Sequence, residues 1–138
     1  VIAVEKSADA IVWLKKNVAR ISENVRVVEG DVADVLPGVK CDVVIANPPY
    51  VPDAQELPRD VADHEPAVAL FGGPTGLDIP GRFIDTAARL LKPGGFFALE
   101  HTEDQGPALK DLLAENFTDI LCHLDLTARP RYTTAVRK

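Results

Sequence analysis

The chain has 138 residues, of which 46% are hydrophobic and 26% charged, a composition typical of one globular domain. Its 21 acidic residues outnumber its 15 lysines and arginines and give a formal net charge of −6, which argues against nucleic acid as a direct partner. No apolar run is long enough to cross a membrane, and the pattern of a secretory signal does not occur. Cys41 and Cys122 lack metal-ligand spacing, so we expect reduced thiols, a cytoplasmic location and no metal site.

The first part of the chain combines apolar runs with one helical pattern. A strand is expected over residues 1–5, "VIAVE", which ends in the carboxylate of Glu5. Ser7 can then cap a helix. Apolar residues at spacings of 3, 4 and 3 predict one buried stripe on this helix, formed by Ile11, Leu14, Val18 and Ile21.

Two more strands and a long loop are expected next. Residues 25–31, "VRVVEGD", run into a Gly-Asp turn, and residues 41–50, "CDVVIANPPY", form the third strand, with the apolar Val43, Val44 and Ile45 at its centre. Strands of this kind are usually covered on both faces, which indicates a parallel sheet. Residues 51–78 are rich in proline and glycine, and we expect a loop with one short helix. A loop of this length in a compact domain is usually functional or disordered.

The second half is predicted to continue with a helix, a strand and another helix. The first helix has Pro80 in its first turn and ends before "KPGG", and the strand "FFALEH" follows at residues 96–101. The helix after it, over residues 105–116, is expected to bury three leucines, Leu109, Leu112 and Leu113.

Two closing strands, residues 119–126 and 131–137, are joined by a short turn and predict an antiparallel pair. Because strands and helices alternate before them, the sequence predicts an α/β doubly wound, mostly parallel sheet with an antiparallel C-terminal edge. Ligands of such open sheets bind beyond the carboxyl ends of the strands. The candidate site residues expected at such ends are Glu5, Asp31 and Asn47.

The first two of these strand ends indicate an adenosine pocket. The Glu5 carboxylate can accept hydrogen bonds from vicinal ribose hydroxyls, and a solvated surface glutamate is the alternative. Asp31 can accept from the exocyclic amine of adenine while Val32 flanks the ring, although Gly-Asp pairs are also common in ordinary turns. Two carboxylates at successive strand ends together favour adenosine.

The segment Asn-Pro-Pro-Tyr at residues 47–50 is the most specific feature. Proline restricts the residue before it to extended conformations, so Asn47 and Pro48 are held away from helical geometry. A planar substrate NH2 group could donate one hydrogen to the Asn47 side-chain oxygen and the other to the Pro48 carbonyl. The Tyr50 ring would stack on that group or lie beside a sulfonium. A strand-terminating turn with a buried tyrosine is the alternative.

The Asn47 side-chain oxygen and the Pro48 carbonyl would form a two-acceptor clamp for the NH2 group. This clamp suits methyl transfer from a sulfonium, a displacement that positioning accelerates without an obvious general base. His64 and His101 are the candidate bases that the sequence offers near these elements. His101 is expected to be a partly buried, hydrogen-bonded residue at a strand end. His64 lies in the long loop, where it could shape the substrate mouth, and neither is predicted to be catalytic.

These residues resemble the class I S-adenosylmethionine-dependent methyltransferases that modify planar nitrogens. The segments "NPPYVP", "HEPAVALFGGPTGLD" and "LLKPGGFFALEH", in this order, narrow the resemblance to the release-factor glutamine N5-methyltransferase family, PrmC or HemK. The resemblance covers essentially the whole chain. It implies a Rossmann-like fold and S-adenosyl-L-methionine as cofactor, with S-adenosyl-L-homocysteine as the product. The implied substrate is the glutamine of the Gly-Gly-Gln loop in class I peptide chain release factors.

The resemblance also implies residue roles. Glu5 would bind the cofactor ribose, Val32 would lie against the adenine, and Asn47 would contact both cofactor and substrate. The four residues of the substrate-binding motif would be Asn47, Pro48, Pro49 and Tyr50.

The family pattern contains further elements before the position of Val1: a strand, a glycine-rich loop, a helix and a small helical domain. Because the chain also has no methionine, we expect residues 1–138 to be a partial catalytic domain that binds the cofactor weakly or not at all alone. Two alternatives stay open. One is an amino-methyltransferase of nucleic acid, acting on adenine N6 or guanine, and the other is a non-enzymatic adenosine-binding module.

Overall fold

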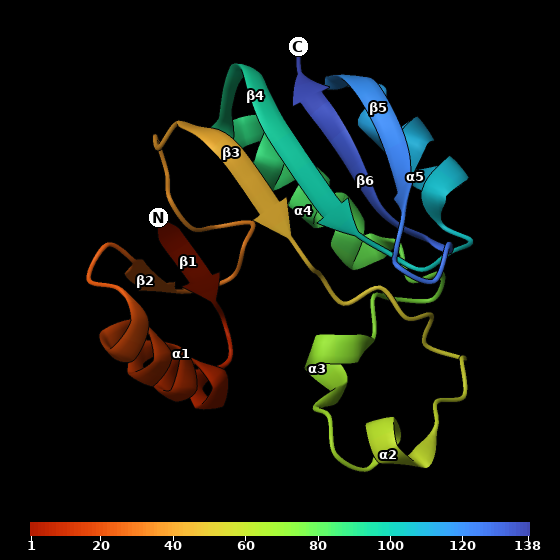
Figure 1. Ribbon diagram of the computed structural model, residues 1–138, viewed down its shortest axis with the longest axis horizontal. Coiled ribbons are helices and arrows are strands. Elements are labelled where there is room, and N and C mark those ends of the chain that lie inside the picture. Colours follow the sequence, from red (N-terminus) through yellow and green to blue (C-terminus); the bar gives the residue numbers. More distant parts are fainter. The chain divides into compact units, whose positions relative to one another are not determined.

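The computed structural model describes residues 1–138, which divide into two units, Val1–Val39 and Lys40–Lys138 (Figure 1). The smaller unit contains β1 (Ile2–Glu5), α1 (Ala8–Ile21) and β2 (Arg26–Glu29). The two strands pair in parallel, with Ile2 opposite Arg26 and Glu5 opposite Glu29. The predicted strand–helix–strand order and the parallel pairing are therefore confirmed for this unit.

Ser7 caps α1 as the sequence predicts, because its Oγ accepts a hydrogen bond from the Ala10 amide at 3.3 Å. The predicted stripe is only partly buried. Ile11 is buried, whereas Ile21 is 82% exposed. Helix α1 has 14 residues and is about 21 Å long. Each strand of this unit has four residues and spans about 13 Å, so the two-stranded sheet cannot cover the whole helix.

The larger unit contains a four-stranded mixed sheet in the order β3-β4-β6-β5. Its strands are β3 (Cys41–Ala46), β4 (Leu91–Glu100), β5 (Phe117–Leu124) and β6 (Pro130–Arg137). Strands β3 and β4 are parallel, and β6 lies antiparallel to both β4 and β5. The α/β class and the antiparallel C-terminal edge are thus confirmed, although the strands form two separate sheets with two parallel and two antiparallel pairs.

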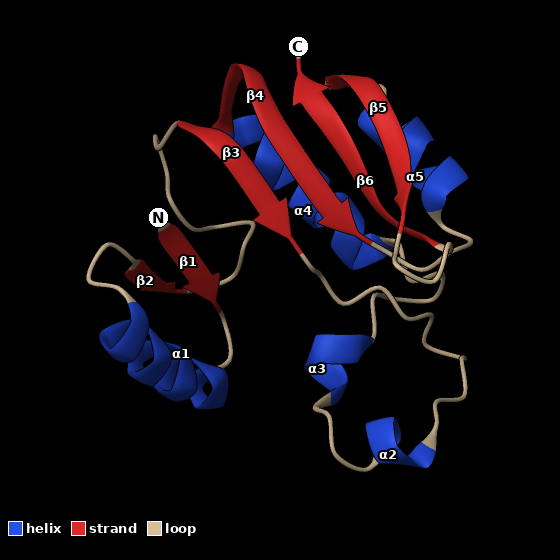
Figure 2. Ribbon diagram, viewed as in Figure 1, coloured by secondary structure: helices blue, strands red, loops and turns tan.

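Two helices, α4 (Asp78–Leu90) and α5 (Gly106–Leu113), pack on one face of this sheet (Figure 2). The core lies between them and the sheet, and its fully buried side chains include Phe97, Leu99, Leu109 and Leu113. None of the helices in the structure has the length and apolar character that crossing a membrane requires.

Four details of the larger unit differ from the sequence-based expectations. The apolar centre of β3 was expected to be covered on both faces, but Val43 is 53% and Ile45 77% exposed, since α4 and α5 both pack on the other face. Leu112 is 44% exposed, because α5 turns Leu109 and Leu113, four residues apart, toward the core.

The segment "KPGG" belongs to β4 instead of preceding it. The ladder shifts register there, with Cys41 opposite Leu91 and Val43 opposite Phe96, so the extra residues form an irregularity within one strand. The long loop holds two short helices instead of one, α2 (Arg59–Ala62) and α3 (Ala67–Leu70).

Candidate active site

Glu5 ends β1, and Asp31 follows the end of β2, the parallel strand that pairs with β1 in the smaller unit. Glu5 is the last residue of β1, and its backbone carbonyl accepts a hydrogen bond from the Gly30 amide at 2.9 Å, just before Asp31. Its side-chain Oε1 accepts from the Ser7 amide at 2.7 Å, which fixes the carboxylate at the start of α1. One carboxylate oxygen is thus engaged locally, and Oε2 has no protein donor.

Asp31 lies two residues beyond the end of β2. Its Oδ1 accepts from the Ala33 amide at 3.0 Å, and its Oδ2 lies 3.4 Å from Nζ of Lys6. The first contact is the ordinary Asx turn that was the alternative for this aspartate. Asp31 and Val32 are both half-buried. The pocket for an adenine ring at these residues stays a prediction.

The Asn-Pro-Pro-Tyr segment leaves β3 directly, as predicted. Asn47 follows Ala46, the last strand residue, and is exposed, and no protein group hydrogen-bonds its side chain. Pro48 is less than 2% exposed, so its carbonyl has little open surface in this conformation. Asn47 is therefore the accessible half of the predicted two-acceptor clamp, and the Pro48 half stays a prediction.

The segment Phe71–Gly76, "FGGPTG", lies back along the end of this motif. Val51 and Phe71 form an isolated parallel bridge, in which the Val51 amide donates to the Leu70 carbonyl and the Gly72 amide donates to the Val51 carbonyl, both at 2.9 Å. The approach requires glycine. A Cβ at Gly72 would lie 2.6 Å from the Pro49 carbonyl oxygen, and one at Gly76, where φ is +73°, would overlap the Tyr50 carbonyl oxygen.

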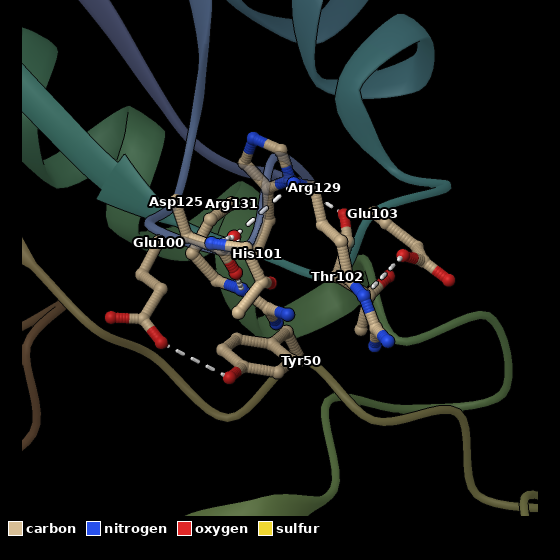
Figure 3. A network of polar contacts seen from close by, with 9 residues as sticks. Tyr50, Glu100, His101, Thr102, Glu103, Asp125, Arg129 and Arg131 are labelled. Carbon is tan, nitrogen blue, oxygen red and sulfur yellow. Dashed lines mark hydrogen bonds and ion pairs between the residues drawn. The ribbon is translucent and has the colours of Figure 1, made fainter.

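The Tyr50 side chain is anchored at its hydroxyl (Figure 3). The hydroxyl donates to Oε1 of Glu100, at the end of β4, at a distance of 3.2 Å. Arg131 of β6 also contacts it. Burial, followed by the negative charge of Glu100, raises the pKa of Tyr50 above its ordinary value of 10.0, and Arg131 opposes this in part. Tyr50 therefore stays a neutral donor at physiological pH. Its predicted stacking on a substrate stays a prediction.

Arg131 is itself held by Asp125, whose Oδ2 lies 3.3 Å from the arginine Nε. Asp125 begins the turn between β5 and β6, and its Oδ1 accepts from the Thr127 hydroxyl at 2.7 Å and from the Arg129 amide at 3.1 Å. These hydrogen bonds hold the pKa of Asp125 well below its usual range. The β5–β6 turn thus supports the charged group that faces Tyr50.

Gln105 is a third residue that holds the Asn-Pro-Pro-Tyr motif in place, after Glu100 and Arg131. Its side chain is 7% exposed, and its Nε2 donates to the Tyr50 carbonyl at 2.9 Å and to the Gly76 carbonyl at 3.2 Å. Three residues that support the motif, Glu100, Gln105 and Arg131, were missed in the sequence. No local pattern marks them, since each comes from a segment at least 50 residues from Tyr50.

The two candidate histidines lie in different environments, and His101 is more deeply buried than the sequence predicts. His101 is fully buried, with Nδ1 2.7 Å from the Thr102 carbonyl and Nε2 2.8 Å from the Thr133 hydroxyl. The carbonyl can only accept, so Nδ1 carries the proton and Nε2 accepts from Thr133. Burial lowers the pKa of His101, which keeps it neutral. His64 is exposed in the long loop.

Comparison with known proteins finds relatives that align with nearly the whole chain. The chain is 41% identical, over 141 aligned residues, to a release factor glutamine methyltransferase of Mycolicibacterium smegmatis, an alignment that covers 99% of the chain. It is 37% identical to the enzyme of the same name from Streptomyces coelicolor over 96% of the chain. The chain is homologous to the release factor glutamine methyltransferases. No family model matches it.

The chain spans about half the length of these release factor glutamine methyltransferases, 50% of the Mycolicibacterium protein and 49% of the Streptomyces protein. Solved structures share its fold at low sequence identity. A methyltransferase from Pyrococcus furiosus has a TM-score of 0.72 at 18% identity, and the alignment covers 100% of the chain and 62% of that structure. The 16S rRNA N2 G1207 methyltransferase of Thermus thermophilus, solved with AdoMet and guanosine, has a TM-score of 0.69 at 21% identity, covering 100% and 31%. The Rossmann-like methyltransferase fold is therefore confirmed.

Proposed function

We propose that residues 1–138 form part of the catalytic domain of a cytoplasmic methyltransferase that acts on the glutamine of the Gly-Gly-Gln loop of class I peptide chain release factors. The observation that carries the proposal is Asn47. It is an exposed amide with no protein partner, at the carboxyl end of a parallel strand, and the chain after it is fixed by the contacts of Tyr50 and Val51. The homology to release factor glutamine methyltransferases supports the substrate.

S-adenosyl-L-methionine would supply an electrophilic methyl group on a sulfonium, and the residues of the smaller unit fit its adenosine half. Glu5 keeps Oε2 free to accept from a ribose hydroxyl, while its Oε1 is held by the Ser7 amide at 2.7 Å. Val32, half-buried beside Asp31, would supply an apolar edge for the adenine. The Asp31 carboxylate would accept from the exocyclic amine of the adenine.

Asn47 would orient the nucleophile. A glutamine side chain presents a planar NH2 group, and the Asn47 oxygen can accept one of its hydrogens, with the Pro48 carbonyl as the second acceptor. Held in this way, the nitrogen lone pair would face the methyl group that the cofactor supplies, and water would take the N–H proton that the nitrogen releases. The neutral, anchored Tyr50 would border this position with its ring.

Positioning alone can account for a large share of such a reaction, because well-oriented groups reach effective molarities on the order of 10⁵ M or more. This agrees with the environment of His101. His101 is buried and has both ring nitrogens engaged, so it cannot serve as a base.

The test is a methyl-transfer assay with radiolabelled S-adenosyl-L-methionine and four acceptors in parallel: a class I release factor, tRNA, rRNA and duplex DNA. We expect label on the release factor, at the glutamine of its Gly-Gly-Gln loop, and none when that glutamine is replaced by alanine. Label on nucleic acid alone would replace the proposal with an amino-methyltransferase of nucleic acid. Binding of the cofactor without transfer to any acceptor would favour an adenosine-binding module.

A further inference from the structure

Gln105 is a buried polar side chain whose amide nitrogen donates to two carbonyls of the long segment after β3. It precedes α5 and occupies the cap position of that helix, yet its side chain makes no capping hydrogen bond. Instead, both Nε2 hydrogens are used, on the carbonyls of Tyr50 and Gly76, at 2.9 and 3.2 Å. Its Oε1 accepts from the Thr102 amide at 3.1 Å, which in turn fixes the amide group itself.

These hydrogen bonds connect two backbone carbonyls from separate segments through one side-chain amide. Tyr50 closes the Asn-Pro-Pro-Tyr motif, and Gly76 lies 26 residues later, at the end of the loop that carries α2 and α3. Two carbonyl oxygens side by side repel, so the Gln105 donor between them favours the close approach that the backbone hydrogen bonds of Val51 also support. Gly76 allows this arrangement because it has no Cβ. A Cβ there would overlap the Tyr50 carbonyl and lie 2.7 Å from the Gln105 nitrogen.

We infer that Gln105 is a positioning residue: its side-chain amide sets the direction in which the Asn-Pro-Pro-Tyr motif presents Asn47. This inference rests on the proposed function, since Asn47 is the proposed substrate contact. The connection between Tyr50 and Asn47 is short and stiff. Only Pro48 and Pro49 separate Asn47 from Tyr50, and the φ of each proline is fixed by its ring, so a displacement of the Tyr50 backbone is transmitted to Asn47 instead of being absorbed.

A purely structural role is the competing explanation, because removal of any buried, fully bonded amide destabilises a fold. The two roles differ in what they change. A structural role lowers thermal stability and leaves turnover intact at temperatures where the variant is folded. A positioning role lowers kcat in the folded variant and spares cofactor affinity, because Glu5 and Val32 belong to the other unit.

Two variants in the full chain separate these roles. Gln105→Met keeps the length of the side chain and removes the amide. Gln105→Glu keeps an acceptor for Thr102 and replaces the donors with a carboxylate facing two carbonyls. The matched control is Leu113→Ala in α5, the helix that follows Gln105, which opens a cavity at a fully buried side chain without touching the motif.

We expect both Gln105 variants to lower kcat by about tenfold to a hundredfold, the scale of a small misplacement of reacting groups, with the Kd for S-adenosyl-L-methionine within about twofold of the unchanged chain. Leu113→Ala should lower Tm at least as much and keep kcat within about twofold when assayed well below its Tm. Wild-type kcat in both folded Gln105 variants would overturn the inference, as would an equal loss of kcat in Leu113→Ala.

A second readout needs no methyl transfer. The chain has two tyrosines, so a Tyr132→Phe background leaves Tyr50 as the only titrating phenol in absorbance at 295 nm. Burial and Glu100 raise the pKa of Tyr50, and release of its backbone should bring that pKa down toward 10 in Gln105→Met. An unchanged Tyr50 titration would contradict the inference. If the wild-type chain methylates no release factor, the proposed function fails, while this titration still decides whether Gln105 positions the motif.

Discussion

The hydroxyl of Tyr50 donates a hydrogen bond to Oε1 of Glu100 at 3.2 Å, and this contact joins the loop after β3 to the end of the neighbouring strand β4. Strands β3 and β4 already pair in parallel up to Ala46 and Leu99, so the tyrosine continues the connection beyond the last ladder position. Together with Gln105 on its carbonyl, the hydroxyl contact holds Tyr50 at both ends. The motif is therefore fixed by tertiary contacts as well as by its prolines.

The first prediction concerns this hydroxyl. Tyr50→Phe removes a donor from a charged acceptor and keeps the ring. Because Tyr50 is only half-buried, we expect a loss of about 1 kcal/mol in the free energy of unfolding, measured by urea denaturation at pH 7. Tyr132→Phe is the matched control. The Tyr132 hydroxyl has no protein partner and its ring stacks on His123, a contact that phenylalanine retains. Equal losses in the two variants would show that the Glu100 contact contributes nothing.

Asn47→Ala should abolish the orientation of the substrate amide. The side chain is exposed and makes no contact that supports the fold, so we expect stability to stay within about 0.5 kcal/mol of the wild type. Methyl transfer should fall by about 10² or more, because an oriented nucleophile depends on such contacts. The control is Asn17→Ala, an exposed asparagine in α1. Turnover near the wild-type value in Asn47→Ala would reduce the motif to a strand-terminating turn.

Glu5→Ala tests the cofactor half of the site. Loss of a carboxylate that accepts from ribose should weaken binding of S-adenosyl-L-methionine by about tenfold to a hundredfold, the range for hydrogen bonds to a charged group. The measurement is calorimetric titration, with cofactor concentrations high enough for the weak binding expected of residues 1–138 alone. Glu29→Ala is a close control, because Glu29 is the register partner of Glu5 in the ladder and is exposed. Similar losses in both variants would point to net charge instead of a specific contact.

Gly76→Ala should show that the close approach of two backbones requires glycine. The added Cβ would overlap the Tyr50 carbonyl, and the residue has φ of +73°, a region that costs an L-residue about 1–2 kcal/mol by itself. We expect a loss of at least about 2 kcal/mol in the free energy of unfolding. Gly81→Ala in α4 is the control, since no atom lies within 4 Å of the added Cβ, and it should stabilise the chain by up to about 1 kcal/mol.

The sequence predicted those parts of the site that depend on local patterns. Glu5 and Asn47 lie at strand ends as expected, because alternating apolar runs and the proline pair define where those strands stop. Gln105, Glu100 and Arg131 could not be predicted, since their role depends on which segments the fold brings beside Tyr50. The same dependence on tertiary contacts explains why the burial of β3 was predicted wrongly. Its apolar run predicted a buried strand, but coverage depends on which face α4 and α5 take, and Ile45 is left 77% exposed.

The last prediction is a pH dependence of stability set by His101. Burial lowers the pKa of this imidazole from its ordinary value of 6.5, with Arg131 adding to the effect and Thr102 and Glu100 opposing it. In the unfolded chain the group takes up a proton near pH 6.5, whereas the folded chain resists protonation until a lower pH. The contribution is therefore fully present above pH 6.5 and is lost as the pH falls from there toward the folded-state pKa.

We expect the urea midpoint of the wild type to decrease from pH 7.5 to pH 5, and the decrease to be smaller in His101→Gln, which has no titrating group at this position. The variant should be less stable at pH 7.5, because the buried hydrogen bonds to Thr102 and Thr133 are disturbed, and the two curves should converge at low pH. An NMR titration of the His101 ring provides the direct measurement. Parallel curves for the two proteins over this range would show that His101 does not control the acid sensitivity of the fold.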